Sequence, residues 1–186
     1  TAAGKTMGLL TVPLESIGTA MATYAGQNLG AARMDRVRKG VNSALIIAAV
    51  YAVASLIILH YADIAIMGLF LDTAKEVEIV AMGRQYLFWN SVFFIPLGWL
   101  IVWRYSIQGL GFSSLAMLAG VAEMVARTAV ALALVPLLGY PGAIMANPAA
   151  WVAACLFLYP AYIWTCRQLD NRLLAAKLHM QGPRAE

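Results

Sequence analysis

Long apolar stretches alternate with short polar segments along the whole chain. Residues 41–62 and 86–103 contain no Asp, Glu, Lys or Arg, and residues 128–166 form a longer uncharged run. A helix rises about 1.5 Å per residue, so about 20 apolar residues cross about 30 Å of hydrocarbon. The pattern therefore predicts five spanning helices, at about residues 7–25, 41–62, 86–103, 112–135 and 143–166.

The segments between and after these helices have sequence patterns that predict further structural elements. Residues 72–84 are weakly amphipathic and are expected to form a short helix at the membrane interface. The PLLGYPG sequence at 136–142 predicts a turn between the last two spans. Residues 167–186 follow the fifth span as a tail. The predicted fold class is an all-α, polytopic transmembrane helical bundle that forms one membrane domain.

Composition supports this interpretation. The chain has 186 residues, of which 62% are hydrophobic and 12% charged, whereas soluble domains are about half apolar and about one quarter charged. The formal net charge of +4 does not point to nucleic acid, because the basic residues cluster beside the spans. Cys155 and Cys166 lie about 16 Å apart along one predicted helix, too far for a disulfide, and no metal site is expected.

The distribution of Lys and Arg predicts the orientation, since basic loops stay on the cytoplasmic side. The loop after the first span and the tail after the fifth are both basic, and four spans separate them, an even number. Both are therefore placed in the cytoplasm of a multi-pass protein of the plasma (cytoplasmic) membrane. The loop residues, which are also expected to contact anionic lipid, are Arg33, Arg36, Arg38 and Lys39.

Two ionisable side chains lie deep in the fourth predicted span. Glu123 and Arg127 are four residues apart, so they share one helix face and are expected to pair. Charges at this depth cost at least about 2.5 kcal/mol each and usually face a protein interior or a watery cavity. One interpretation is a proton or cation relay in a transport pathway. The other is a neutralised pair that holds this helix to a neighbour, because a paired carboxylate stays ionised.

The first span carries the other candidate pathway residues. Glu15 and Thr19 are four residues apart, and Thr23 continues a polar stripe at helical spacing. Such a helix lines a cavity, or else its hydroxyl groups bond the carbonyl groups of their own helix. Asn90 in the third span is a further pathway candidate, and Pro96 in the same span permits a bend.

The sequence contains no hydrolytic signature and no nucleotide-binding loop. The chain is therefore not expected to be an enzyme or to need a cofactor. If it transports, it is expected to use an ion gradient or an equilibrating flux.

Three short motifs follow one another in the chain. They are QNLGA with a basic stretch at 27–39, R-x-x-x-Q-G-x-G at 104–111, and G-x-x-E-x-x-x-R at 120–127. With these motifs the chain resembles the multidrug and toxic compound extrusion (MATE) family of secondary transporters. The residues that match structural positions at the cytoplasmic helix ends are Gln27, Asn28, Gly30, Gln108, Gly109 and Gly111; Arg104, Gly120, Glu123 and Arg127 complete the second and third motifs.

The resemblance implies helices eight to twelve of a twelve-helix, two-lobe transporter, so that the chain is a partial C-terminal lobe. Such proteins export drugs or organic cations by Na⁺- or H⁺-coupled antiport and alternating access. The N-terminal lobe is then a missing partner, and the isolated chain is expected to lack transport activity. Some members carry an acidic residue in the tenth helix, whereas the corresponding helix of this sequence offers Asn90 and no carboxylate, so the resemblance does not predict which ion is coupled.

Two other functions stay open. The wider superfamily also includes flippases for lipid-linked saccharides, which tend to have more cationic residues in the cavity. A non-transporting membrane scaffold or a half-length subunit is the third hypothesis. The expected partners are membrane lipid and a cationic or amphipathic small molecule, and no nucleic acid.

Overall fold

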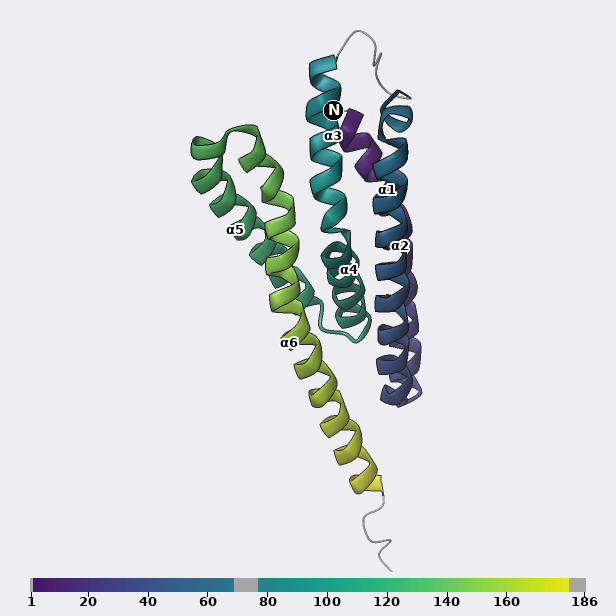
Figure 1. The fold of residues 1–186 in the computed structure, drawn as a ribbon. Helices are drawn as coiled ribbons and strands as arrows, with labels where there is room; N and C mark the ends of the chain where they lie inside the picture. Colours follow the sequence, from purple (N-terminus) through teal and green to yellow (C-terminus); the bar gives the residue numbers. More distant parts are fainter. Residues whose placement is uncertain (1, 69–76, 181–186) are drawn as a thin grey trace, which may run out of the picture.

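A computed structural model of the chain describes residues 2–68 and 77–180, and every element within these ranges is an α-helix. The predicted all-α helical bundle is therefore confirmed. In Figure 1 the helices stand roughly along one axis, with the N-terminus at one end and the last turns of α6 extending beyond the other. The helices are α1 Ala2–Gly30, α2 Met34–Gly68, α3 Val77–Val92, α4 Phe94–Gly109, α5 Ser113–Leu138 and α6 Tyr140–Met180.

A tight turn joins α1 to α2. The Arg33 N–H donates to the Asn28 carbonyl at 2.8 Å and the Ala32 N–H donates to the Leu29 carbonyl at 2.8 Å, the pattern of a Schellman C-cap. Ala32 has a φ of 53°, although glycine usually occupies this left-handed position. The glycine of the QNLGA motif, Gly30, is instead the last residue of α1.

The third predicted span is two helices. α3 and α4 meet at Phe93 with a bend of 53° between Glu78–Val92 and Phe94–Gly109. Pro96 explains the break, because proline has no N–H to donate to the carbonyl of Val92 and its ring crowds that carbonyl. The separate interfacial helix expected at 72–84 was also wrong in part. Residues 77–84 are continuous with α3, and residues 72–76 lie outside the described ranges.

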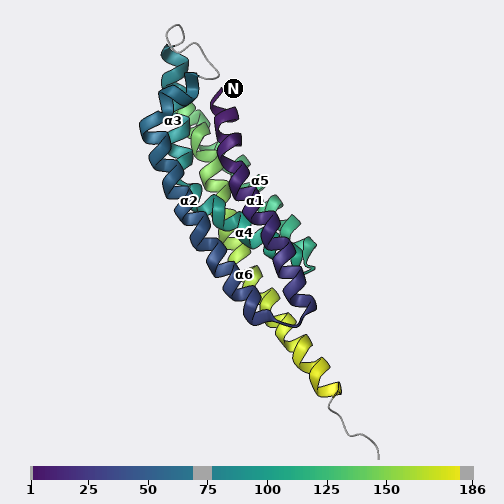
Figure 2. The same cartoon turned by 90° about the vertical axis from the view of Figure 1, so that its right-hand side faces the viewer.

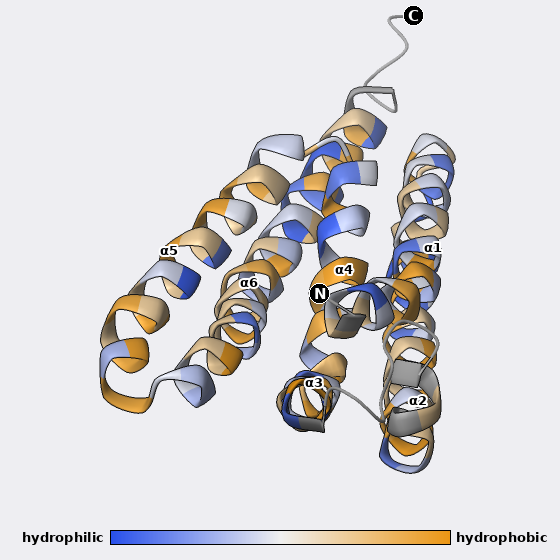
Figure 3. Ribbon diagram, turned by 90° about the horizontal axis from the view of Figure 1, so that it is seen from above, coloured by the Kyte–Doolittle hydropathy of each residue, from blue (hydrophilic) through white to orange (hydrophobic). Residues whose placement is uncertain are grey.

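A second hairpin follows. α5 and α6 are joined at Gly139, whose φ is 62° and whose N–H donates to the Val135 carbonyl at 2.8 Å. α5 packs chiefly on α6 and leaves most of its surface exposed; Figure 3 shows it at the edge of the bundle. α6 runs on without interruption through residues 167–180, so this part of the expected tail is helical.

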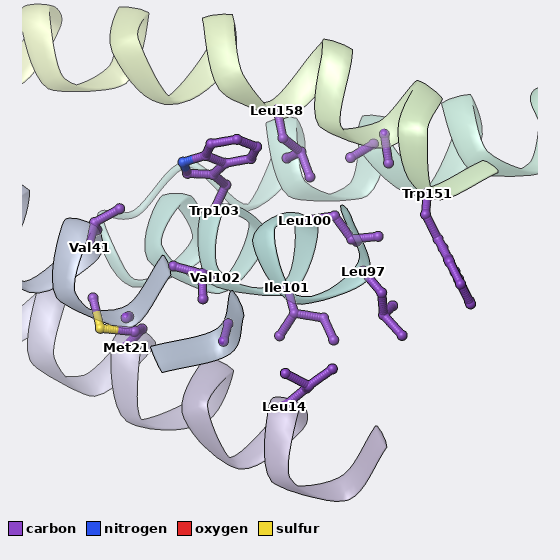
Figure 4. Packing of buried hydrophobic residues seen from close by; sticks show 14 of the residues in the cluster. Leu14, Met21, Val41, Leu97, Leu100, Ile101, Val102, Trp103, Trp151 and Leu158 are labelled. Atoms are coloured by element: carbon purple, nitrogen blue, oxygen red, sulfur yellow. The ribbon is translucent and has the colours of Figure 1, made fainter. Parts of the chain in front are cut away.

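α4 is the centre of the molecule, since it packs against α1, α2, α5 and α6. Its apolar side chains are buried along nearly its whole length. Figure 4 shows Leu97, Leu100 and Ile101 of α4 among side chains from α1 and α6. Gly109 allows the closest approach, because a Cβ there would lie 2.2 Å from the Ala22 carbonyl oxygen of α1. The central position of α4 determines which polar residues can meet.

Within the described residues, three helices are long and apolar enough to cross a membrane, by length and composition: Met34–Ala62, Ser113–Leu138 and Tyr140–Leu178. The bent pair α3–α4 makes a fourth span if both parts are counted together. α1 has 29 residues but is not among them, so a span at 7–25 stays a prediction. These helices indicate a membrane protein.

Candidate functional site

A cluster of polar side chains joins α4 to two neighbouring helices, α1 and α5. The Tyr105 hydroxyl group donates a hydrogen bond of 2.7 Å to Oε2 of Glu15 on α1. The neighbouring Arg104 donates through Nη2 to Oε1 of Glu123 on α5 and forms an ion pair with it. We call Glu15, Arg104, Tyr105 and Glu123 the four-residue cluster.

The helical geometry of α4 explains this arrangement. Consecutive residues of an α-helix point about 100° apart, so Arg104 and Tyr105 reach different neighbours, α5 and α1. Gly18 makes room for the tyrosine ring, because a Cβ at this position would lie 2.7 Å from Cδ2 of Tyr105. One small residue on α1 therefore lets the Tyr105 ring reach the Glu15 carboxylate one turn away.

The charges of the cluster do not cancel. Two carboxylates face one guanidinium group, and Arg104 interacts electrostatically with Glu15 as well as with Glu123. The side chains of Arg104 and Glu123 are 26% and 16% exposed, so their pair is largely withdrawn from solvent. Glu15 is exposed and has a neutral hydroxyl group as its hydrogen-bond donor. The cluster therefore holds one excess negative charge, which is less well compensated at Glu15.

The expected pairing of Glu123 with Arg127 was wrong. Within the described residues, the ion pair of Glu123 is formed with Arg104 of another helix. Arg127 is exposed and interacts electrostatically with Tyr86 of α3. Helical spacing makes an i,i+4 contact available, but α4 brings a guanidinium group directly against Glu123.

The hydroxyl stripe of α1 bonds its own helix. Ser16 donates to the Val12 carbonyl at 3.0 Å, Thr19 donates to the Ser16 carbonyl at 3.0 Å, and Thr23 donates to the Thr19 carbonyl at 3.3 Å. These are the local bonds of the alternative interpretation. Thr19 and Thr23 are nevertheless exposed on the same helix as Glu15, so they stay pathway candidates, and each hydroxyl oxygen can still accept hydrogen bonds.

Asn90 is buried instead of facing a cavity. Its side chain has no exposed surface, and its Nδ2 donates to the Tyr86 carbonyl at 2.8 Å. Asn147 of α6 donates to Oδ1 of Asn90 at 3.4 Å and to the Tyr86 hydroxyl group at 3.2 Å. These bonds tie α3 to α6 and give Asn90 a structural role, while its pathway role stays a prediction.

The second motif has a structural explanation at each of its glycines. Gly109 permits the close contact with α1, and Gly111 has a φ of 89° in the turn that ends α4. The Phe112 N–H donates to the Ile107 carbonyl at 3.1 Å and the Gly111 N–H to the Gln108 carbonyl at 3.0 Å, a second Schellman cap. Gln108 contributes its carbonyl group here, while its side chain is exposed.

The first motif is tied together by a side-chain amide. Nδ2 of Asn28 donates to the Tyr24 carbonyl at 2.8 Å, and the Gln27 carbonyl accepts from the Ala31 N–H at 3.2 Å. The Gln27 side chain is exposed. Asn28 therefore stabilises the last turn of α1 through its side-chain amide, whereas Gln27 contributes its backbone carbonyl group.

The basic loop divides into two kinds of residue. Arg33 donates two hydrogen bonds of 2.9 Å to Asp35, and Arg38 forms an ion pair with Asp170 of α6. Arg36 and Lys39 are exposed, and within the described residues neither has an acidic partner. We call the end of the bundle that holds these four cations the basic end.

Sequence reasoning missed the partners of the candidate residues. Arg104 was assigned only to a motif, and no partner was predicted for Tyr105, Asn147 or Asp170. The available signal for Arg104 was its position in the same apolar helix as Trp103 and Ile107, where an unpaired cation is costly. Nothing in the local sequence indicates that Tyr105 meets Glu15, since 90 residues separate them.

Comparison with known proteins gives one match. A family model described as MatE matches residues 1–133, which is more than half of the chain. No curated protein and no solved structure matches it. The match includes all three motifs and the whole four-residue cluster. The chain therefore belongs to the MatE family of membrane transporters.

Proposed function

We propose that the chain is the C-terminal lobe part, helices eight to twelve, of a secondary active transporter that exchanges Na⁺ or H⁺ for drugs or organic cations. The observation that carries this proposal is the excess negative charge of the four-residue cluster between α1, α4 and α5. A carboxylate within a membrane-spanning helix usually faces a protein interior or a watery cavity and marks an ion or substrate path, because a charge that faces hydrocarbon is costly.

The two carboxylates have different tasks in this proposal. Glu123 is held by Arg104 and so stays ionised, which suits a contact between helices better than proton exchange. Glu15 accepts a hydrogen bond from a neutral hydroxyl group and is exposed. Glu15 is therefore the group that takes up the coupling proton or Na⁺, and neutralising it weakens the attraction for a cationic substrate. Exclusive occupancy of one negative site by ion or substrate then couples their exchange, and alternating access exposes this site to each side of the membrane in turn.

The charge balance also bears on the cargo. A lipid-linked saccharide carries phosphate groups and would favour unpaired cations in the cavity. Within the described residues, the least exposed guanidinium group, that of Arg104, is neutralised by Glu123. This supports an exporter of cations over a flippase of the same superfamily.

Transport in proteoliposomes tests the proposal. The protein would be expressed from its complete reading frame, and uptake of a cationic dye would be driven by an imposed Na⁺ or H⁺ gradient. Glu15→Gln should lower gradient-driven transport about 10- to 100-fold, the loss expected when a charged contact worth about 1.5–3 kcal/mol is removed. Tyr105→Phe, which keeps the carboxylate, should have a smaller effect.

Glu78→Gln is the matched control, because Glu78 is an exposed carboxylate outside the cluster and should leave transport unchanged. Loss of gradient dependence in Glu123→Gln but not in Glu15→Gln would assign the ion site to Glu123 instead. No gradient-driven transport by the unmodified protein would support the scaffold hypothesis.

A further inference from the structure

An open groove runs along the surface between α1 and α2. These helices lie side by side (Figure 2), and the groove between them has a volume of about 490 Å³. The part farther from the basic end is apolar, with Ile17 and Met21 on one wall and Ile47 on the other. The part nearer that end is formed by Tyr24, Gly40 and Ser43.

Two cations stand where the groove reaches the basic end. Residues four apart lie above one another on a helix face, so Arg36 precedes Gly40 by one turn and Lys39 precedes Ser43 by one turn. Both cations are exposed, whereas the other two of the loop are bound to Asp35 and Asp170. The positive charge that stays uncompensated therefore lies at the mouth of the groove.

Tyr24 connects the apolar part to the charged part. Its ring covers Gly40 so closely that a Cβ there would lie 2.3 Å from Cε1 of the tyrosine. Its hydroxyl group donates to the Arg36 carbonyl at 3.2 Å, which holds the first turn of α2 against α1. A ring with an apolar body and a polar tip is typical of the boundary between hydrocarbon and head groups.

We propose that this groove binds one anionic phospholipid. The phosphate group lies at Arg36 and Lys39, and one acyl chain lies along Met21, Ile17 and Ile47. Charge complementarity identifies the occupant, because paired basic residues beside an apolar channel match a phosphate joined to a hydrocarbon chain. The proposal is independent of the ion site, from which it differs in helix pair and in chemistry.

Native mass spectrometry of the 186-residue chain in detergent tests the proposed lipid site, with phosphatidylglycerol and phosphatidylcholine as probes. The chain should retain one phosphatidylglycerol molecule under conditions that remove phosphatidylcholine. Arg36→Gln with Lys39→Gln should weaken phosphatidylglycerol binding about 30-fold, the loss expected from two surface cations. The matched control, Arg167→Gln with Lys177→Gln, removes the same charge from exposed positions of α6 and should change binding less than about threefold.

A second variant tests the groove itself. Ala20→Trp fills the groove from an exposed position of α1 and should weaken phosphatidylglycerol binding while thermal unfolding stays unchanged. Glycerol phosphate, which has the head group without chains, should not compete. Equal retention of the two lipids, equal losses in the two double variants, or competition by glycerol phosphate would each overturn the proposal.

Discussion

At the scale of single residues, two turns close in the same way with different residues. The turns after α1 and after α4 are both Schellman caps, with Ala32 and Gly111 at the left-handed position. A left-handed conformation costs an alanine about 1–2 kcal/mol, because its Cβ crowds the following carbonyl oxygen. The α1–α2 turn therefore stores strain that a glycine would release.

Ala32→Gly should raise the free energy of unfolding by about 1 kcal/mol, because glycine adopts a positive φ without this clash. Thermal unfolding in detergent, followed by circular dichroism, measures the change. Ala31→Gly is the control, since Ala31 is the neighbouring turn residue and has no positive φ. The control should be neutral or destabilising, and an equal gain from both changes would mean that the φ of Ala32 is not strained.

At the scale of helices, the contact between α1 and α4 depends on a glycine. Gly109 of α4 lies against the backbone of Ala22, and Gly26 of α1 lies close to the Gly109 carbonyl oxygen. Small residues let helix backbones approach closely, which favours van der Waals contact within membranes. This contact also sets the register in which Tyr105 meets Glu15.

Gly109→Ala should lower the free energy of unfolding by about 1–3 kcal/mol, because the added methyl group meets a backbone carbonyl that cannot rotate away. Thermal unfolding provides this measurement too. Gly120→Ala should instead be neutral or stabilising by about 0.5–1 kcal/mol, since a Cβ at Gly120 meets nothing within 4 Å and alanine favours a helix. A neutral Gly109→Ala would show that α1 and α4 separate without cost.

At the scale of the whole molecule, the α5–α6 hairpin stands beside the group formed by α1 to α4. α5 reaches α4 at the Arg104–Glu123 ion pair, and α6 reaches α2 at the Arg38–Asp170 ion pair. Only the first of these pairs is largely withdrawn from solvent, so it contributes more to how the hairpin is attached.

Arg104→Gln should destabilise the molecule by about 2 kcal/mol or more, because it leaves a half-buried carboxylate without its partner. The double variant Arg104→Gln, Glu123→Gln removes both charges and should recover part of the loss. Chemical unfolding in detergent gives the coupling between the two changes. Additive losses would show that the pair makes no net contribution.

The sequence by itself determined the class of the protein, because long uncharged stretches leave few alternatives to buried or lipid-facing helices. It also placed the turn near Gly139 and the bend near Pro96, since the chemistry of these residues acts within one or two turns. The three motifs pointed to the family that the family model then showed. These inferences all depend on neighbours in the chain.

Only the tertiary structure decided which polar groups meet. Glu123 forms an ion pair with Arg104 of another helix, and Glu15 accepts a hydrogen bond from Tyr105, which is 90 residues away in the sequence. It also decided which cations of the basic loop keep their charge available, because α4 packs against both α2 and α6 and so brings Asp170 of α6 near Arg38 of α2. Helical spacing defines the contacts that a residue can make within its own helix. The close packing of α4 with its neighbours selects the contact that is actually made.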